Sequence, residues 1–352
     1  TYGFGVTVAD YDNDNDQDFF FTTIWQNYLF RNDGGIFTDV SVGSGLEKDS
    51  LWSTTAIFID GDQDGWVDLF VGSYVDWSPK NDIWCTTDGY KKDYCTPELY
   101  NGIPSRYYRN NGDGTFQEIT DKAFGDVINI RSATTIACAD VDNDGWLDFY
   151  VGTGYPSLDA LMPNLLFRND RGKRFQEVTN AGFGHLQKGH GISFADLGND
   201  GDQDVYHSLG GFVKEDGFWN ILLENPGSGN NWVTLHLEGV RSNRSAIGAE
   251  ITIQASGPKG NRTIYRVVGT GGSYGSSTLQ QEIGLGQCNK IRSIKIYWPS
   301  STISQEFQNV DINKFYHLSE DQDRLTAITR KKVQLSKLSI NKGHSSHHHN
   351  HH

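Results

Sequence analysis

A nine-residue aspartate pattern occurs four times in the first 204 residues, and it constrains the fold more than any other feature of the chain. Carboxylates recur at positions 1, 3, 5 and 9, and position 6 is glycine in three copies and Asn15 in the other. The copies, called loops 1 to 4 below, are 10–18, 60–68, 140–148 and 196–204. Self-similarity at such intervals is typical of propellers, solenoids and other repeat arrays.

Short runs of β-branched and aromatic residues flank each loop, and such runs are typical of strands. They precede the loops at 5–9, 55–59, 135–139 and 192–195, and follow them at 19–21, 69–71, 149–151 and 205–206. A second hairpin, with Asn, Asp or Gly at its tip, follows at 28–37, 107–116 and 165–175. Two hairpins per repeat supply the four strands of a propeller blade. Four blades stand at the lower limit for closure, so the propeller is either incomplete or closed by strands that the pattern does not reveal.

A different pattern begins near residue 231. The stretches 233–237, 250–254, 263–268 and 293–297 alternate with a period of two, and a last short strand is expected at 315–318. We therefore expect an all-β chain with a propeller over 1–228 and a small antiparallel sandwich or barrel over 229–320. Residues 321–352 are expected to form a charged linker or short helix and a His-rich tail, either an added tag or a native metal-binding tract. The chain opens inside a repeat, which indicates a processed, trimmed or partial sequence.

The aspartate loops are predicted calcium sites. Carboxylates at these positions converge if the loop coils around one point, and position 7 can add a backbone carbonyl. Oxygen ligands without His or Cys favour calcium over zinc or copper. Solvated acidic turns are the alternative interpretation. The predicted ligands are Asp10, Asp12, Asp14, Asp16 and Asp18 in loop 1; Asp60, Asp62, Asp64, Trp66 and Asp68 in loop 2; Asp140, Asp142, Asp144, Trp146 and Asp148 in loop 3; and Asp196, Asp200, Asp202 and Asp204 in loop 4.

Loop 4 is expected to bind calcium more weakly than the other three. Gly198 removes the position-3 carboxylate, and Asp202 is the residue that can replace it. The formal net charge of the chain is −14, and crowded carboxylates repel each other. We therefore expect the ions to stabilise the fold rather than to perform chemistry.

Two cysteines and two sequons carry further expectations. Cys85 and Cys95 lie in one surface excursion, which suggests a disulfide in an extracellular chain, with two free thiols as the alternative. The sequons begin at Asn243 and Asn261. Asn261 lies at an expected hairpin tip and is the better glycan candidate, whereas Asn243 has the alternative role of a turn residue.

These repeats resemble the FG-GAP/VCBS type, which is also seen in integrin α-chain propellers. The later stretches 231–239, 242–249, 271–275, 283–286 and 297–300 resemble the ASPIC/UnbV domain. The excursion that carries Cys85 and Cys95, followed by residues 107–114, also resembles that family. Together they make the chain similar to the cartilage acidic protein family, as a bacterial relative. The resemblance implies an extracellular or cell-surface propeller with calcium loops.

Charge and motif content then separate the function classes. An acidic chain repels phosphate backbones and anionic membranes, and no apolar run approaches the roughly 18 residues that a membrane span needs. No Gly-x-Ser-x-Gly elbow is present. We expect a secreted, non-enzymatic, calcium-stabilised scaffold for adhesion or extracellular structure.

Its expected partners are further copies of itself, joined into a filament through an unpaired strand edge, or another extracellular protein or a glycan. The alternative is a hydrolase or cyclase acting on a sugar or a terpenoid in the propeller channel or the domain cleft. A cleft that holds a perturbed acid beside a nucleophile, away from the loops, would favour that alternative.

Overall fold

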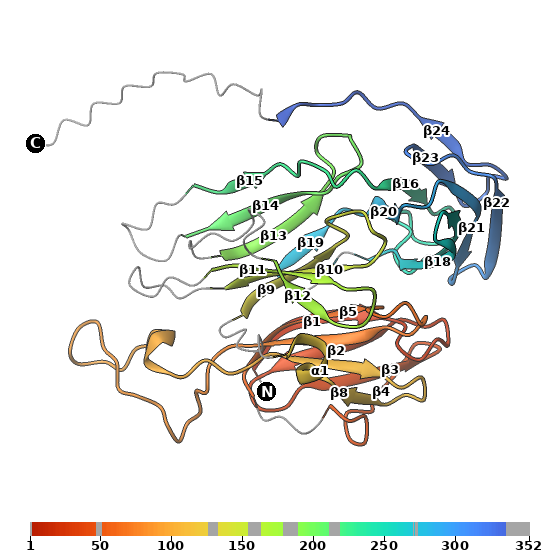
Figure 1. The fold of residues 1–352 in the computed structure, drawn as a ribbon. Coiled ribbons are helices and arrows are strands. Elements are labelled where there is room, and N and C mark those ends of the chain that lie inside the picture. The colour runs from red at the N-terminus through yellow and green to blue at the C-terminus, as the bar shows by residue number, and fades with distance from the viewer. Residues whose placement is uncertain are drawn as a thin grey trace, which may run out of the picture.

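The structure is a computed structural model that describes residues 2–46, 51–125, 133–153, 163–178, 189–210, 219–269, 271 and 274–335. Within these ranges nearly all regular structure is β-strand (Figure 1). The helical elements there are one 3₁₀ turn, Pro97–Leu99, and one short helix, α1, Thr120–Phe124. The expected all-β fold is therefore confirmed. No helix in the described ranges is long and apolar enough to cross a membrane.

Three antiparallel sheets follow one another along the chain, each with its four strands in chain order. Blade 1 comprises β1 (Gly3–Ala9), β2 (Asp18–Thr23), β3 (Tyr28–Asp33) and β4 (Ile36–Asp39). Blade 2 comprises β5 (Ser53–Ile59), β6 (Asp68–Ser73), β7 (Arg106–Asn110) and β8 (Phe116–Glu118). Blade 3 comprises β9 (Ala133–Ala139), β10 (Asp148–Thr153), β11 (Leu165–Asn169) and β12 (Phe175–Glu177). Each blade begins with a strand, an aspartate loop and a second strand, as the sequence predicts.

Blade 4 differs from the others. It contains β13 (Gly189–Ala195), β14 (Asp204–Leu209) and β15 (Ile221–Leu223), after which the described chain continues into the C-terminal sheets. Its remaining strand, β19 (Gly275–Ser277), comes from the C-terminal part of the chain and pairs in parallel with β13. The two parts of the molecule therefore share one sheet.

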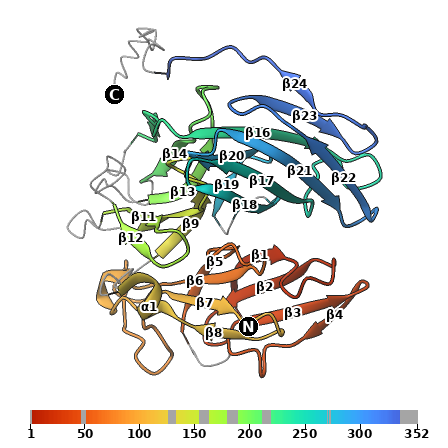
Figure 2. The ribbon, with the colours of Figure 1, turned by 45° about the vertical axis from the view of Figure 1, so that its right-hand side comes forward.

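The C-terminal part is a sandwich of two four-stranded sheets, in the orders β20-β16-β23-β24 and β18-β17-β21-β22. Its strands are β16 (Asn231–Glu238), β17 (Glu250–Gly257), β18 (Gly260–Val267), β20 (Gln281–Gly286), β21 (Lys290–Trp298), β22 (Ile303–Gln308), β23 (Phe315–Ser319) and β24 (Thr326–Ile328). Aliphatic side chains and the fully buried Trp298 fill the space between the sheets. Figure 2 shows the sandwich above blades 1 and 2 and beside blades 3 and 4.

Two details of the sandwich differ from expectation. β16 and β23 pair in parallel, whereas the sequence suggested a wholly antiparallel arrangement. A long connection joins these strands, and such a connection permits a parallel pair where a tight hairpin does not. Residues 326–328 form strand β24 within the stretch expected to be a linker or short helix, because they pair with β23. The His-rich tail lies outside the described residues.

Adjacent blades pack face to face through apolar side chains. One buried cluster joins blades 1 and 2, an aromatic-rich cluster joins blades 2 and 3, and a third joins blades 3 and 4. Between blades 2 and 3 the ring of Phe149 lies 5.2 Å from that of Phe70 and 4.7 Å from that of Phe175. Burying an aromatic side chain of this kind stabilises the fold by roughly 1.5–3 kcal/mol. The joints between blades are thus the main cores of the N-terminal part.

Glu320, directly after β23, is a buried carboxylate that holds one loop of the sandwich. One of its oxygens accepts the backbone N–H groups of Val240, Arg241 and Ser242 at 2.7–2.8 Å, and the hydroxyls of Ser242 and Ser301 donate to the other. Burial alone would raise the pKa of Glu320, but these hydrogen bonds lower it to about 2.

We expect Glu320→Gln to lower the free energy of unfolding by about 3 kcal/mol at neutral pH, because the depressed pKa is worth about 1.4 kcal/mol per unit. The contribution is present above the unfolded-state pKa near 4.5 and is lost as the pH falls toward 2. Urea unfolding of the wild type and the variant from pH 6 to roughly pH 3 measures it. Glu306→Gln, at an exposed position of β22, is the control. A difference that does not shrink on acidification would refute this account.

Candidate metal centres in the aspartate loops

Each aspartate loop is coiled by its own first carboxylate. In loop 1 the backbone N–H groups of Asp14 and Asn15 donate to Asp10 at 3.1 and 2.8 Å. In loops 2 and 4 the position-5 and position-6 N–H groups likewise donate to the position-1 aspartate of the loop. In loop 3 the position-6 N–H donates to the position-1 aspartate. Position 6 has a positive φ in every loop, 76° at Asn15 and 89–91° at the three glycines. This confirms the expectation that position 6 needs glycine or asparagine.

Three of the four loops gather carboxylate oxygens closely enough to hold one ion. Within the described residues, three trios have ligand atoms that lie within 4.8 Å of one another. They are Asp10, Asp12 and Asp18; Asp60, Asp62 and Asp64; and Asp140, Asp142 and Asp148. The remaining predicted ligands fall outside these trios. Asp16, for example, accepts the N–H of Gly34 at the tip of the next hairpin, at 2.6 Å.

Each trio also contains a buried carboxylate oxygen without a hydrogen-bond partner in the described structure. These atoms are Asp12 Oδ1, Asp62 Oδ1 and Asp140 Oδ1. A buried polar atom that lacks a partner is costly, and a carboxylate oxygen more so than a neutral one. A cation at the centre of each trio would give the unpartnered oxygen of that trio a partner. The donor set, which is oxygen throughout, therefore fits calcium.

The electrostatics of the loops also indicate that they need a bound cation. Burial, together with the charge of neighbouring carboxylates, raises the pKa of Asp10 to about 6 and the pKa values of Asp18, Asp60 and Asp140 to about 7. Each loop therefore carries negative charge that is expensive to keep ionised without a counter-charge. When bound, calcium supplies that positive charge.

The position-9 aspartates have a second role, which the sequence did not suggest. One oxygen of each accepts the backbone N–H of an asparagine near the end of the third strand, or just after it in blade 4, at 2.7–3.0 Å. The pairs are Asp18 with Asn32, Asp68 with Asn110, Asp148 with Asn169, and Asp204 with Asn225. The recurrence of Asn after Arg or Glu at the end of the third strand is the signal that could have identified it.

The same asparagines tie neighbouring blades together. Asn110 donates its side-chain amide to the carbonyl at position 2 of loop 1, Asn169 to that of loop 2, and Asn225 to that of loop 3, each at 2.8 Å. In the other direction, the position-4 amides of loops 1, 2 and 3 donate to the position-6 carbonyl of the following loop. The candidate metal loops are therefore also the joints between blades.

Loop 3 is shared with the sandwich. Asp140 Oδ2 accepts the N–H of Gly284 at 3.0 Å and lies 3.5 Å from the guanidinium of the buried Arg266, so the other oxygen is the one left for a metal. Arg262 donates to the carbonyl of Asp144 and stacks over the ring of Trp146, 5.1 Å from its centroid. These contacts hold the sandwich on the third blade.

Loop 4 has a different environment. Its carboxylates form no metal-sized trio within the described residues. The ammonium of Lys332 lies 3.1 Å from Asp200, and the backbone N–H of Val333 donates to the carbonyl of Gly198 at 2.7 Å. Asp202 accepts a hydrogen bond from Asn143 of loop 3 at 2.9 Å. Chain 330–333 thus covers the loop where the sequence predicted a fourth, weaker site, and its lysine brings a positive charge there.

The remaining predicted sites lie outside the loops. Cys85 and Cys95 are joined in a disulfide within the excursion between β6 and β7. The side chain of Asn243 holds the turn that follows it. Its amide donates a hydrogen bond to the carbonyl of Ile247, and its oxygen accepts one from the N–H of the same residue. Asn261 is exposed at the start of β18, at a hairpin tip, and its glycosylation stays a prediction.

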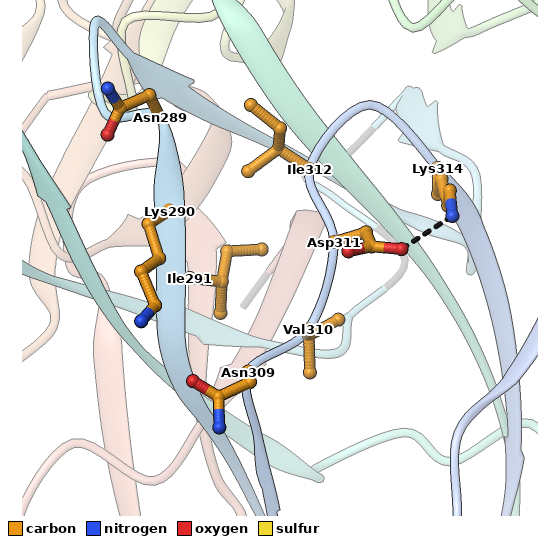
Figure 3. Close-up of a pocket in the computed structure, with 8 residues that line it drawn as sticks. All are labelled: Asn289, Lys290, Ile291, Asn309, Val310, Asp311, Ile312 and Lys314. Atoms are coloured by element: carbon orange, nitrogen blue, oxygen red, sulfur yellow. Dashed lines mark hydrogen bonds and ion pairs between the residues drawn. The ribbon is translucent and has the colours of Figure 1, made fainter.

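Two hollows in the described part of the chain offer room for a ligand. One is a pocket of about 510 Å³ in the sandwich. Figure 3 shows Ile291, Val310 and Ile312 between Lys290 and an ion pair from Lys314 to Asp311. A second cavity, of about 570 Å³, lies between the first strands of blades 1 to 3, which are β1, β5 and β9, and strands β17 and β18 of the sandwich. The sandwich therefore covers part of the space beside these three strands.

Comparison with known proteins confirms both resemblances. Residues 239–325 match the family described as ASPIC and UnbV, and residues 79–151 match the FG-GAP-like repeat. The chain is 24% identical to human "Cartilage acidic protein 1" over 312 residues, which are 85% of this chain and 41% of that protein. The chain thus spans about two fifths of the length of this curated relative.

Solved structures are also similar, at low scores. One is an Agrocybe aegerita lectin described as recognising non-reducing terminal N-acetylglucosamine, with a TM-score of 0.35, 14% identity and coverage of 85% of this chain and 72% of that one. Another is the Dos1 propeller, with a TM-score of 0.33, 12% identity and coverage of 93% and 65%.

Proposed function

We propose that this chain is a secreted, calcium-stabilised propeller scaffold that serves adhesion or extracellular structure and is not an enzyme. The observation that carries the proposal is the placing of three carboxylate trios at the joints between blades. A cation in such a loop strengthens a joint, and the joints hold the N-terminal part together. The disulfide of the excursion is in keeping with an oxidising, extracellular compartment.

The enzyme alternative depends on the cavity beside the sandwich. Away from the loops, its perturbed acids are Glu282, whose pKa burial raises to about 7, and Glu250, whose pKa burial also raises. Both oxygens of Glu282 accept hydrogen bonds, from Asp196 N–H, Gln203 and Gln280, so this carboxyl acts as a structural acceptor between the two parts of the chain. The hydroxyl of Ser277, in the same cavity, donates to the carbonyl of Cys138. These engagements favour the scaffold over the hydrolase or cyclase.

The disulfide-closed excursion is the surface that we propose for partner binding. Tyr90 and Tyr94 are 89% and 97% exposed, and Trp84 is exposed as well. Lys91 lies between the two tyrosines. Exposed aromatic side chains supply contact area at low entropic cost, and they also stack on sugar rings. The proposed partner is therefore an extracellular protein or a glycan.

Binding by immobilised protein to arrays of glycans and of extracellular matrix proteins tests this function. In millimolar calcium we expect at least one ligand to bind, and the double variant Tyr90→Ser, Tyr94→Ser to lose roughly tenfold or more in affinity, equivalent to about 1.4 kcal/mol. Trp219→Ser, which removes an exposed aromatic outside the excursion, is the matched control. Conversion of a sugar or terpenoid substrate by the wild type would establish the enzyme alternative instead, and a blank array would contradict the adhesive role.

A further inference from the structure

The outer face of one sandwich sheet carries two histidines and a glutamate at neighbouring positions. Strands β16 and β23 run in parallel side by side (Figure 2), and their register places His236 directly opposite His317. Glu238 lies two residues beyond His236 in β16, so both side chains point to the same face of the sheet. Leu235 and Leu237 point the other way, into the core of the sandwich.

The imidazole of His317 faces the carboxylate of Glu238. Its Nε2 atom lies 3.2 Å from Oε2 of Glu238, and both side chains are partly buried. Two ligand atoms that share one tetrahedral zinc ion are roughly 3.3 Å apart, because each lies roughly 2.0–2.1 Å from the metal. The same distance suits a hydrogen bond, so the third side chain decides whether this pair can be part of a metal site.

The third side chain, His236, lies at the distance that a shared metal requires. Its ring centroid is 5.4 Å from that of His317. Imidazoles that each give one nitrogen to the same tetrahedral zinc have ring centroids roughly 5 Å apart, by the same metal–ligand distance. In the described structure the three ligand atoms are not gathered within 4.8 Å as those of the aspartate trios are. The ring of His236 is exposed, however, and can turn about its Cβ–Cγ bond to direct a nitrogen toward the other two ligands.

The charges around this group select the kind of metal. The guanidinium of Arg244 lies 2.8 Å from Oε1 of Glu238, so the other oxygen is the one directed at His317. Partners of this kind orient a metal ligand from outside the coordination shell. Arg330 stacks over the ring of Phe315, 5.0 Å from its centroid, two residues before His317 in β23. One carboxylate beside two guanidinium groups offers little negative charge to calcium, whereas imidazole nitrogen favours zinc.

We propose that His236, His317 and Glu238 form a zinc site on the outer face of the sandwich. Two imidazole nitrogens and one carboxylate oxygen bind the metal, and a water molecule or a donor from a bound partner takes the fourth position. The site shares no ligand with the aspartate loops, so it does not depend on calcium binding there.

The melting temperature as a function of zinc chloride concentration, in millimolar calcium to keep the aspartate loops filled, tests the proposal. We expect zinc to raise the melting temperature of the wild type, because binding to the native state stabilises it. His236→Ala and His317→Ala should each lose roughly tenfold or more in zinc affinity. His190→Ala, which removes an exposed histidine from β13, is the matched control and should respond like the wild type. Every variant carries the same His-rich tail, so zinc bound by the tail cancels in these comparisons.

Glu238→Gln separates metal binding from a purely structural contact. It keeps a hydrogen-bonding side chain beside His317 and removes the charged ligand oxygen, so its melting temperature without zinc should match the wild type while its zinc affinity falls roughly tenfold. A wild type that zinc does not stabilise would overturn the proposal. So would a zinc response that all the variants share with the wild type, or losses of stability in the alanine variants that are equal with zinc and with a zinc chelator.

Discussion

Chelation of calcium is expected to lower the melting temperature of this protein by roughly 15 °C or more. An ion present at about 100 times its dissociation constant stabilises the native state by about 2.7 kcal/mol. Domains of about 150–250 residues shift by about 2–4 °C per kcal/mol, and the three trios give three such contributions. Differential scanning calorimetry before and after EDTA treatment measures the shift.

Restoration is the control for that experiment. Re-addition of calcium in excess of EDTA should return the original melting temperature, because the loops are coiled by their own hydrogen bonds and need only the ion. Magnesium at equal concentration should restore less, since it requires a tighter octahedral site than a loop of this size offers. A melting temperature that EDTA leaves unchanged would refute calcium stabilisation.

Asp148→Ala is expected to destabilise the fold in a calcium-dependent way and Asp204→Ala is not, although both residues occupy position 9. Asp148 accepts two backbone N–H groups, those of Val141 and Asn169, at 3.0 and 2.7 Å, and Asp204 accepts three, those of Leu197, Gly198 and Asn225, at 2.9–3.2 Å. Stranding a buried N–H group costs roughly 1–3 kcal/mol. Asp148 also belongs to a metal trio and Asp204 does not, so its loss removes the contribution of one ion in addition.

The pair of variants separates hydrogen bonding from metal binding. The destabilisation by Asp148→Ala relative to the wild type, measured by urea unfolding, should be about 2–3 kcal/mol smaller in EDTA than in calcium, because EDTA removes the ion from the wild type. The destabilisation by Asp204→Ala should be the same in both conditions. A loss in Asp148→Ala that does not change between calcium and EDTA would mean that loop 3 does not bind an ion that stabilises the fold.

The local parts of the fold were predictable from the sequence. Alternating strands, turn residues and the coiled aspartate loops depend on neighbours a few residues apart, and the positive φ at Asn15 and Gly145 follows from the residue type alone. Periodicity likewise predicted most strands of the sandwich. The resemblance of the repeats to known families then gave the order of the blades.

The contacts between distant segments were not predictable in the same way. Nothing in the sequence shows that β19 would join blade 4, or that Arg266 would lie beside Asp140, because both depend on how the sandwich docks. Asn110 looks like an ordinary turn residue until the preceding blade is placed beside it. Lys332 likewise gains its position over loop 4 only when the end of the chain folds back.

Native mass spectrometry of the protein in calcium tests the central claim most directly, because it counts the bound ions. The account predicts three calcium ions per chain, one for each trio, and one fewer in Asp62→Ala, which removes a buried oxygen that has no other partner. A chain that carries no calcium, or an ion count that Asp62→Ala leaves unchanged, would contradict it.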